Sequence, residues 1–364
     1  MPGAKADREV FQSLTGLRFV LAIWITLYHL ALMYGPEELG ASPILAMGAA
    51  RVDGFFLLSG FVLAHIYAVR PGSRFAFGRF LQARIARLYP LHLLALTLLA
   101  TAVGTALLLG RSEQAEAYTL LGFAANLLML QGLNVPGAGA WNFPAWTLSA
   151  EFFAYLCFPL FLFLAKLFAK RGLLFLLIAL VFVAAVEMAW ALVADERLGA
   201  LTHNWGVLRG ACGVLVGVAL RYAFDKLRWS ALQSLGAALS GGLLAGMAAA
   251  QEAPLAALHA AAGLMILGLA ALDRSGRRTP LAAPMMQQLG EISFALFILH
   301  VPIMVIATQA LAIMGWDGEL NWWVAMALMA ASLGGAFLAN RLVEQPARET
   351  IRSWRASGRV PAAA

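Results

Sequence analysis

Residues 17–29 read Leu17-Arg18-Phe19-Val20-Leu21-Ala22-Ile23-Trp24-Ile25-Thr26-Leu27-Tyr28-His29 and lie inside the first long apolar segment of the chain. In a helix, at about 100° per residue, Arg18 and His29 fall on one face, roughly 16 Å apart along the axis. Such a helix carries a charge near one membrane surface and an imidazole deeper in the membrane. The pair suits a site that binds a charged group and transfers a proton. The structural alternative is an arginine at the membrane interface and a histidine satisfied by a neighbouring helix.

The composition of the chain is typical of a membrane protein. Its 364 residues are 62% hydrophobic and 12% charged, whereas a soluble domain has about 25% charged residues. Repeated apolar runs of about 20 residues predict transmembrane helices rather than barrel strands. The net charge of +7 fits basic cytoplasmic loops, and no nucleic-acid partner is expected. Both cysteines, Cys157 and Cys212, fall within apolar runs, so the sequence predicts no disulfide framework.

Apolar segments cover most of the chain. They are residues 14–33, 52–69, 88–110, 119–131, 148–168, 173–193, 204–220, 229–250, 255–272, 288–313 and 322–340. The fourth is too short to cross about 30 Å of hydrocarbon. If it does not span, every basic loop faces the cytoplasm and every acidic loop faces outwards, as the positive-inside rule requires. We therefore expect an all-α integral membrane protein, a bundle of about ten transmembrane helices. Both termini are expected to be cytoplasmic, with residues 111–144 forming a short re-entrant or interfacial segment on the outer side.

The domain organisation is expected to be simple, because the sequence shows no internal repeat and no Ser- or Pro-rich linker. We expect a cytoplasmic N-terminal segment at 1–13, one transmembrane domain at 14–346 and a basic cytoplasmic tail at 347–364. The composition is rich in Ala, Gly and Leu and poor in Lys, which indicates a GC-rich bacterial source. The expected location is therefore the inner (cytoplasmic) membrane, which the chain crosses several times.

Three arginines fall at the inner ends of helices in this topology. Arg18 lies at the inner end of the first helix, while Arg84 and Arg87 precede the third and are neighbours on one helical face. Guanidinium groups bind phosphates well, so this basic group can hold a phosphorylated ligand. Ordinary positive-inside arginines are the alternative.

The candidate proton-transfer groups fall further out. His29 lies in the outer half of its helix, and Asp53 and Glu151 lie near the outer ends of theirs. A carboxylate beside His29 would fix its tautomer and raise its basicity. Both acids could instead be helix N-caps in the interface. His300, near the middle of a late helix, is a further titratable candidate.

Other buried polar residues have structural or acceptor-side interpretations. Arg209 lies about one turn into its helix from the outer side, so we expect it to form a buried ion pair with a carboxylate. Glu187, His203 and His259 are candidates for lining an acceptor pocket, with plain interface residues as the alternative. Ser59-Gly60 forms a notch of small residues, for which close helix packing is the first expectation.

Four stretches share the pattern of a known family. They are Leu14–His29, Val52–Phe61, Arg84–Pro90 and Trp146–Tyr155, with weaker echoes at Gly290–Phe294, Leu299–His300 and Val343–Pro346. Together they resemble the acyltransferase-3 family of membrane acyltransferases, which includes O-antigen and other polysaccharide O-acetylases. The likeness runs from about residue 14 to residue 346. Thr15, Phe152 and Phe294 stand where this family often has other residues.

The resemblance implies an enzyme that transfers an acyl group from a cytoplasmic acyl-CoA, with acetyl as the first expectation and succinyl or a longer acyl group as alternatives. The acceptor would be a hydroxyl of an extracytoplasmic carbohydrate or glycolipid, and exopolysaccharide, O-antigen, peptidoglycan or a small secondary metabolite all stay open. The predicted catalytic residues are His29, Glu151 and Asp53, the predicted acyl-CoA-binding residues are Arg18, Arg84 and Arg87, and the further candidates are His300, Trp146, Tyr155 and Ser149. Acetyl-CoA would be a substrate and not a bound cofactor. No metal is expected, because no metal-ligand spacing occurs, and a homodimer is possible.

A secondary transporter is the rival class. It would use intramembrane Arg, His and Glu side chains as a coupling path and residues 119–131 as a re-entrant element. Transporters of this kind often have a repeated half, which the sequence does not show. A membrane scaffold or receptor is disfavoured by the number of buried ionisable groups.

Overall fold

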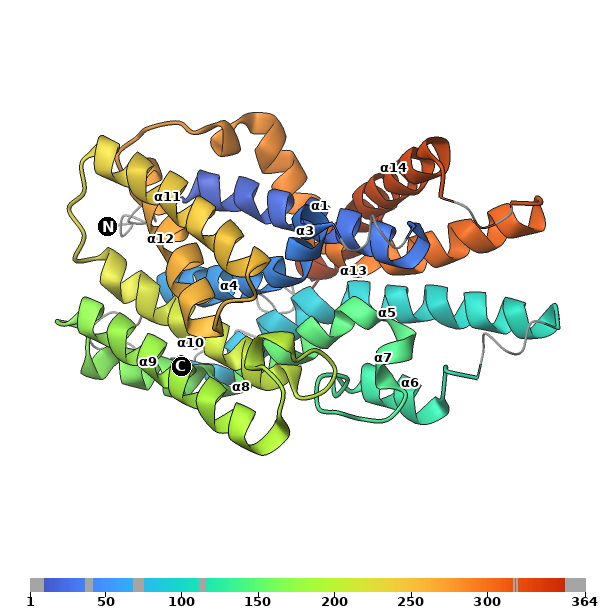
Figure 1. Cartoon of the computed structure of the whole chain (residues 1–364), viewed down its shortest axis with the longest axis horizontal. Helices are drawn as coiled ribbons and strands as arrows, with labels where there is room; N and C mark the ends of the chain where they lie inside the picture. The colour runs from blue at the N-terminus through green and yellow to red at the C-terminus, as the bar shows by residue number, and fades with distance from the viewer. Residues whose placement is uncertain are drawn as a thin grey trace, which may run out of the picture.

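The computed structural model describes residues 10–36, 42–67, 75–110, 116–316, 318 and 320–350, and these residues form helices and no strand. Most helices run along the long axis of the bundle (Figure 1). In chain order they are α1 (Gln12–Tyr34), α3 (Pro43–Ala46), η1 (Met47–Ala50), α4 (Arg51–Tyr67), α5 (Phe77–Leu108), α6 (Leu120–Leu127), α7 (Ala138–Trp141), η3 (Phe143–Ala145), α8 (Trp146–Leu167), α9 (Gly172–Ala194), η4 (Leu198–Ala200), α10 (Gly206–Phe224), α11 (Ala231–Ala250), α12 (Leu255–Arg274), η5 (Pro280–Ala282), α13 (Pro284–Ile313), α14 (Trp322–Ala339) and η6 (Asn340–Glu344). The prediction of an all-α membrane fold is confirmed. Most of the predicted N-terminal segment and of the predicted tail, residues 1–9 and 351–364, lies outside the described residues.

The long helices match the predicted spans. Nine helices in the described part of the chain are long and apolar enough to cross a membrane. A tenth, α4, has 17 residues, which is at the lower limit for a membrane-spanning helix. It lies inside the bundle against α10, where Gly60 and Gly217 meet. The ten long helices therefore correspond to the ten predicted spans.

The segment predicted not to span is α6, which has only eight residues and is therefore about 12 Å long. It lies beside α5 (Figure 1). The hydroxyl of Tyr89 in α5 donates to the carbonyl of Leu127 at 3.2 Å, and Nε2 of His92 lies 2.8 Å from the carbonyl oxygen of Asn126. These contacts are in the first half of α5, so α6 reaches into the bundle without crossing it.

The direction of the helices gives a second check. Phe11, just before α1, packs its ring 5.0 Å from His65 near the end of α4 and 5.6 Å from Phe224 at the end of α10. The backbone N–H of Ser13 donates to Asp273, near the end of α12, at 2.8 Å. The start of α1 thus lies at the same end of the bundle as the ends of α4, α10 and α12. Without α6, these helices are the second, sixth and eighth spans, and each of them ends on the side where α1 begins. If α6 crossed the membrane, α10 and α12 would end on the opposite side.

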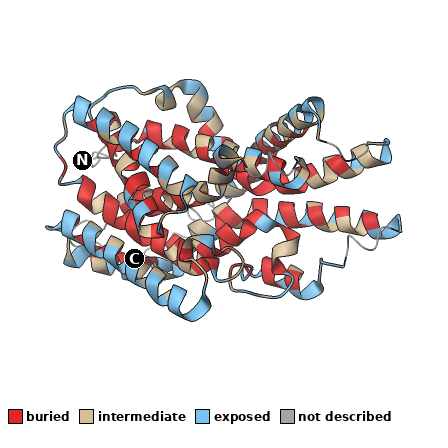
Figure 2. Cartoon of the chain, in the orientation of Figure 1, coloured by how far each residue is buried: buried red, intermediate tan, exposed pale blue. Residues whose placement is uncertain are grey.

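Burial separates a central group of helices from a peripheral one. In the most apolar window of α10, 78% of the residues are buried, against 22% in α9, α11 and α14. Figure 2 shows exposed residues along the outer faces of α9 and α11. Those faces carry apolar side chains such as Leu192 and Leu232. They are the faces that contact lipid acyl chains.

Glycines allow the central helices α4 and α10 to touch backbone to backbone. A Cβ atom added at Gly60 would run into the carbonyl of Val214, and one added at Gly217 would run into the carbonyl of Leu57. The expected packing role of the small-residue notch therefore holds for Gly60. Close approach of this kind strengthens van der Waals contact between helices in a membrane.

Gly217→Ala and Gly104→Ala are expected to change stability in opposite directions. Alanine raises helix propensity by about 1 kcal/mol over glycine, and a Cβ at Gly104 meets nothing within 4 Å. At Gly217 the same Cβ forces α4 and α10 apart, which costs about 1–3 kcal/mol. Thermal unfolding in detergent measures both variants. Equal shifts for the two would mean that the α4–α10 contact is not tight.

Candidate functional site

The three arginines at the inner ends of helices line one cavity. Arg18 comes from α1, while Arg84 and Arg87 come from successive turns of α5. Arg84 has no hydrogen-bond partner for its Nε among the described residues. The cavity therefore offers unsatisfied guanidinium donors, which suit an anion with several oxygens.

A carboxylate network lies in the wall of the same cavity. The hydroxyls of Ser59 in α4 and Tyr155 in α8 donate to the same oxygen of Glu151, at 2.6 Å and 2.5 Å. All three residues line the cavity. The structure therefore groups Glu151 with the arginines and not with His29. Glu151 and Tyr155 are four residues apart on one face of α8, which is why a single helix can present both.

His29 has a different partner. Its Nδ1 lies 2.8 Å from Nε2 of His300, and both side chains are buried. Nδ1 of His300 lies 3.1 Å from the carbonyl oxygen of Leu296. A carbonyl only accepts, so His300 donates from Nδ1 and, when neutral, accepts at Nε2 from His29. This chain of bonds leaves Nε2 of His29 without a proton, as a general base requires.

One face of α13 joins the cavity to the histidine pair. Phe294 and Phe297 line the cavity, and Phe297 lies one turn before His300, with ring centres 6.3 Å apart. The ring of Phe55, which also lines the cavity, packs 5.7 Å from that of Phe297. His29 does not line the cavity. Phe297 is thus the side chain that joins the cavity to the histidine pair.

On its other side His29 faces the loop that precedes α8. The ring of Phe143 lies 5.9 Å from that of His29 and 5.6 Å from that of His203. Phe143 is exposed. Phe143 thus connects the surface of the protein to His29. Of the residues considered for an acceptor pocket, His203 lies here.

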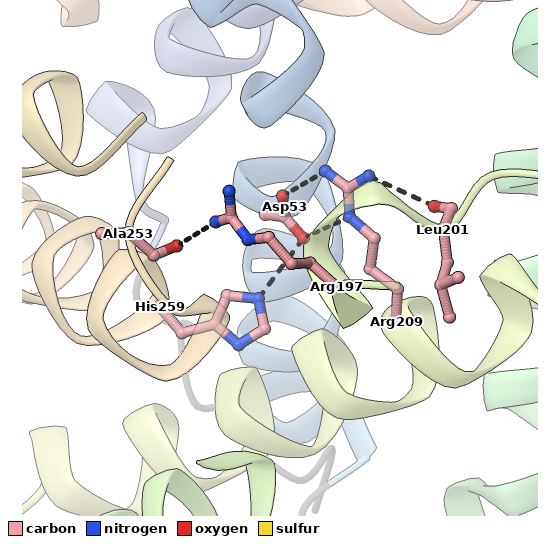
Figure 3. Close-up of polar contacts among 6 residues, drawn as sticks. All are labelled: Asp53, Arg197, Leu201, Arg209, Ala253 and His259. Atoms are coloured by element: carbon pink, nitrogen blue, oxygen red, sulfur yellow. Dashed lines mark hydrogen bonds and ion pairs between the residues drawn. The ribbon is translucent and has the colours of Figure 1, made fainter. Parts of the chain in front are cut away.

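Asp53 lies in a separate buried cluster (Figure 3). Arg209 binds both of its oxygens, at 2.6 Å and 3.1 Å, and Nε2 of His259 lies 3.4 Å from one of them. The predicted buried ion pair of Arg209 is confirmed. The expectation that Asp53 orients His29 is corrected, because its carboxylate instead joins α4 to α10 and α12. Glu187 also has a structural partner, the backbone N–H of Leu255 at 2.8 Å.

The chain is similar in sequence to known proteins. The family model described as an acyltransferase domain, Acyl_transf_3, matches residues 11–341. The chain belongs to the acyltransferase-3 family. It is 29% identical to acyltransferase MdmB of Streptomyces mycarofaciens, over 92% of this chain and 90% of that protein. It is also 44% identical over 98 residues to protein 2 in the picA locus of Rhizobium radiobacter, covering 27% of this chain and 48% of that protein. No solved structure matches the chain.

The predicted resemblance is thus confirmed, and the protein is a multi-pass membrane acyltransferase. Within the described residues, no group of three or more His, Cys, Asp or Glu side chains is arranged to hold a metal ion. The residues that this acyltransferase brings together form two sets, the cavity with its arginines and the pair His29 and His300. Phe297 lines the cavity and has its ring 6.3 Å from that of His300, so it links the two sets.

Two candidates from the Trp146–Tyr155 stretch lie outside the cavity of this acyltransferase. The guanidinium carbon of Arg209 lies 5.5 Å from the ring centre of Trp146, so Trp146 packs against the Asp53 cluster. Ser149 is buried, without a hydrogen-bond partner for its hydroxyl among the described residues, and lies against Gly132. The intervening residues Thr147 and Leu148 line the cavity instead.

Two features of the site differ from the sequence-based expectation. Ser59 is not only a packing residue, because its hydroxyl donates to Glu151. Phe55 and Phe297 were not singled out, although Phe297 precedes His300 by three positions and Phe55 precedes Ser59 by four. Helical spacing from a polar candidate could have found both, since such spacing places side chains on one face.

Proposed function

We propose that the protein is an O-acyltransferase that moves a short acyl group, acetyl in the first instance, from cytoplasmic acyl-CoA to a hydroxyl of an extracytoplasmic carbohydrate or glycoconjugate. The observation that carries this proposal is the arrangement along α13. Phe297 lines the cavity that holds the three arginines, and its ring lies 6.3 Å from that of His300, the partner of His29. A phosphorylated donor in the cavity and a proton acceptor beyond Phe297 are the two parts that such a reaction needs. The inner membrane of a bacterium is the proposed location.

The donor end of the proposal rests on Arg18, Arg84 and Arg87. CoA carries several phosphate oxygens, and the planar guanidinium group matches such oxygens with two parallel hydrogen bonds. Glu151 and Tyr155 line the same cavity. We assign to them the positioning of the thioester arm, and to the arginines the binding of phosphates.

The chemical step is assigned to His29. Its Nε2 takes the proton of the acceptor hydroxyl while the hydroxyl oxygen attacks the thioester carbon. A C–O bond forms, the C–S bond breaks, and the proton passes from His29 to the departing CoA sulfur, so that CoA leaves as a thiol. His300 holds the tautomer of His29 that makes this possible. Asp53 contributes through the position of α4 and not by contact with the reacting atoms.

A short acyl group is proposed because of the aromatic side chains on the way to the histidines. Phe55 and Phe297 pack against each other, and Phe297 lies between the cavity and His300. A thioester carbonyl must pass these rings to reach His29, and a long acyl chain would have to displace them. Acetyl needs the least displacement, which favours acetyl-CoA as the donor.

Arg84→Gln is expected to raise the KM for acetyl-CoA by about ten- to a hundredfold with little change in kcat, because a charge-assisted hydrogen bond contributes about 1.5–3 kcal/mol. The assay follows free CoA thiol from acetyl-CoA with the purified protein in vesicles and a set of carbohydrate acceptors. Arg79→Gln is the matched control, since Arg79 lies on the same helix but does not line the cavity. Equal kinetics for Arg84→Gln and wild type would remove the arginines from the donor site. Transport of an acceptor without thiol release would favour the transporter class.

A further inference from the structure

A second hollow lies between α1, α4, α11 and α12, away from the arginine cavity. It is open to the surroundings, and its wall is apolar except for one charged residue, Arg51. Gly242 and Gly246 of α11 form part of this wall. A Cβ at Gly246 would meet nothing within 4 Å, and one at Gly242 would meet only the sulfur of Met265, at 3.5 Å. The absence of two side chains on α11 therefore creates the groove.

The groove faces the lipid and not the core of the protein. α11 is among the least buried spans, and its exposed face is visible in Figure 2. The opposite wall is the apolar face of α1 from Leu17 to Trp24, about 10 Å along the helix. That length suits a stretch of about eight methylene groups of an extended hydrocarbon chain.

Arg51 lies at one end of this groove without an anionic partner. Its guanidinium stacks on the ring of Trp24 at 4.1 Å, and Nη2 makes a long contact of 3.8 Å to the sulfur of Met47. Its Nε has no hydrogen-bond partner among the described residues, and no described carboxylate lies within ion-pair distance of it. A charged group in an apolar membrane groove is stabilised only by a counter-charge or by water.

We propose that this groove binds one anionic phospholipid, with the phosphate on Arg51 and one acyl chain along Gly242 and Gly246. The single cation complements a phosphate, and the apolar wall complements a hydrocarbon chain but offers nothing to the hydroxyls of a sugar. The N–H of Trp24 donates to the carbonyl of Ile44 at 2.8 Å, which fixes the ring on which the Arg51 guanidinium stacks. The proposal is independent of the reaction that the enzyme performs.

Native mass spectrometry of the delipidated full chain in detergent tests the proposal. The protein is titrated with phosphatidylglycerol and with phosphatidylcholine of the same acyl chains. Wild type is expected to bind one phosphatidylglycerol at least about tenfold more tightly than phosphatidylcholine, because the choline cation of phosphatidylcholine cancels the charge of its phosphate and repels Arg51. Arg51→Gln is expected to bind both lipids equally, and Gly246→Leu, which fills the groove, is expected to bind neither at this site.

Gly236→Leu is the matched control for the groove. Gly236 is also in α11, a Cβ there meets nothing within 4 Å, and it does not line the groove. This variant is expected to bind phosphatidylglycerol as wild type does, and thermal unfolding checks that all variants fold. Equal affinities of wild type for the two lipids, or unchanged binding by Gly246→Leu, would overturn the proposal. Displacement of the lipid by inorganic phosphate, or a dimer mass lost in Gly246→Leu, would assign the groove to free phosphate or to a second copy instead.

Discussion

His29→Ala is expected to lower the rate of CoA thiol release from acetyl-CoA by at least about 10²–10⁴-fold, because general-base catalysis contributes that much. The histidine is buried, and its Nδ1 lies 2.8 Å from His300, so its free nitrogen is held in one direction. The measurement is thiol release by purified protein in vesicles, with thermal unfolding as the check that the variant folds. Turnover near that of wild type would end the assignment of His29 as the base.

The role of His300 as a positioning residue has its own variants. His300→Ala removes the acceptor for the Nδ1 proton of His29, so a smaller loss of rate is expected, together with a shift in the pH–rate profile. His300→Gln keeps an acceptor oxygen near the same place and is expected to recover part of the rate. A purely structural role would give losses that follow the unfolding temperature and leave the pH profile in place.

Arg209→Met is expected to reduce the free energy of unfolding by about 3–5 kcal/mol, because it leaves Asp53 as an uncompensated buried charge. The side chains of Asp53 and Arg209 are 0% and 4% exposed, and they hold α4 against α10. Thermal unfolding in detergent measures the loss. Adding Asp53→Asn to Arg209→Met is expected to cost less than the sum of the two single variants, since the pair acts as a unit.

The exposed pair between Arg197 and Glu252 is the control for that experiment. Its side chains are 43% and 78% exposed. Solvent screens such pairs, so Glu252→Gln is expected to cost no more than about 1 kcal/mol. If Arg209→Met and Glu252→Gln cost the same, the Asp53 cluster would not be a structural link between the central helices.

The helical architecture could be predicted from the sequence because each span is a local property. Length and hydrophobicity decide whether a segment crosses a membrane, and loop charges decide its direction. That reasoning gave ten spans and a short segment at 119–131, which matches the eight-residue helix α6. Loop charges also predicted that Arg84 and Arg87 lie at the same membrane depth as Arg18, which is near the start of the first helix. The four matching stretches gave the family for the same reason, because motifs are local.

The neighbours of each buried polar group could not be predicted in this way. Membrane depth predicted that His29, Asp53 and Glu151 lie in the same half of the bundle, but a side chain at a given depth can face any of several neighbouring helices. Helix packing decides which neighbour it contacts. Gly60 and Gly217 allow α4 to pack directly against α10. This contact places Asp53 of α4 beside Arg209 of α10, where the two side chains form an ion pair.

Close packing of α1 against α13 decided the partner of His29. Gly290 of α13 lies directly on the backbone of Thr15, and the same two helices bring His300 to His29 at 2.8 Å. By itself, the sequence determined the spans, their order, the family and the residues able to carry charge or protons. Only the tertiary structure decided that arginines and Glu151 share a cavity, that two histidines pair beyond Phe297, and that Asp53 is structural. The reason is that hydrophobicity and spacing act along one helix, whereas a site is made by side chains from several helices meeting at one point.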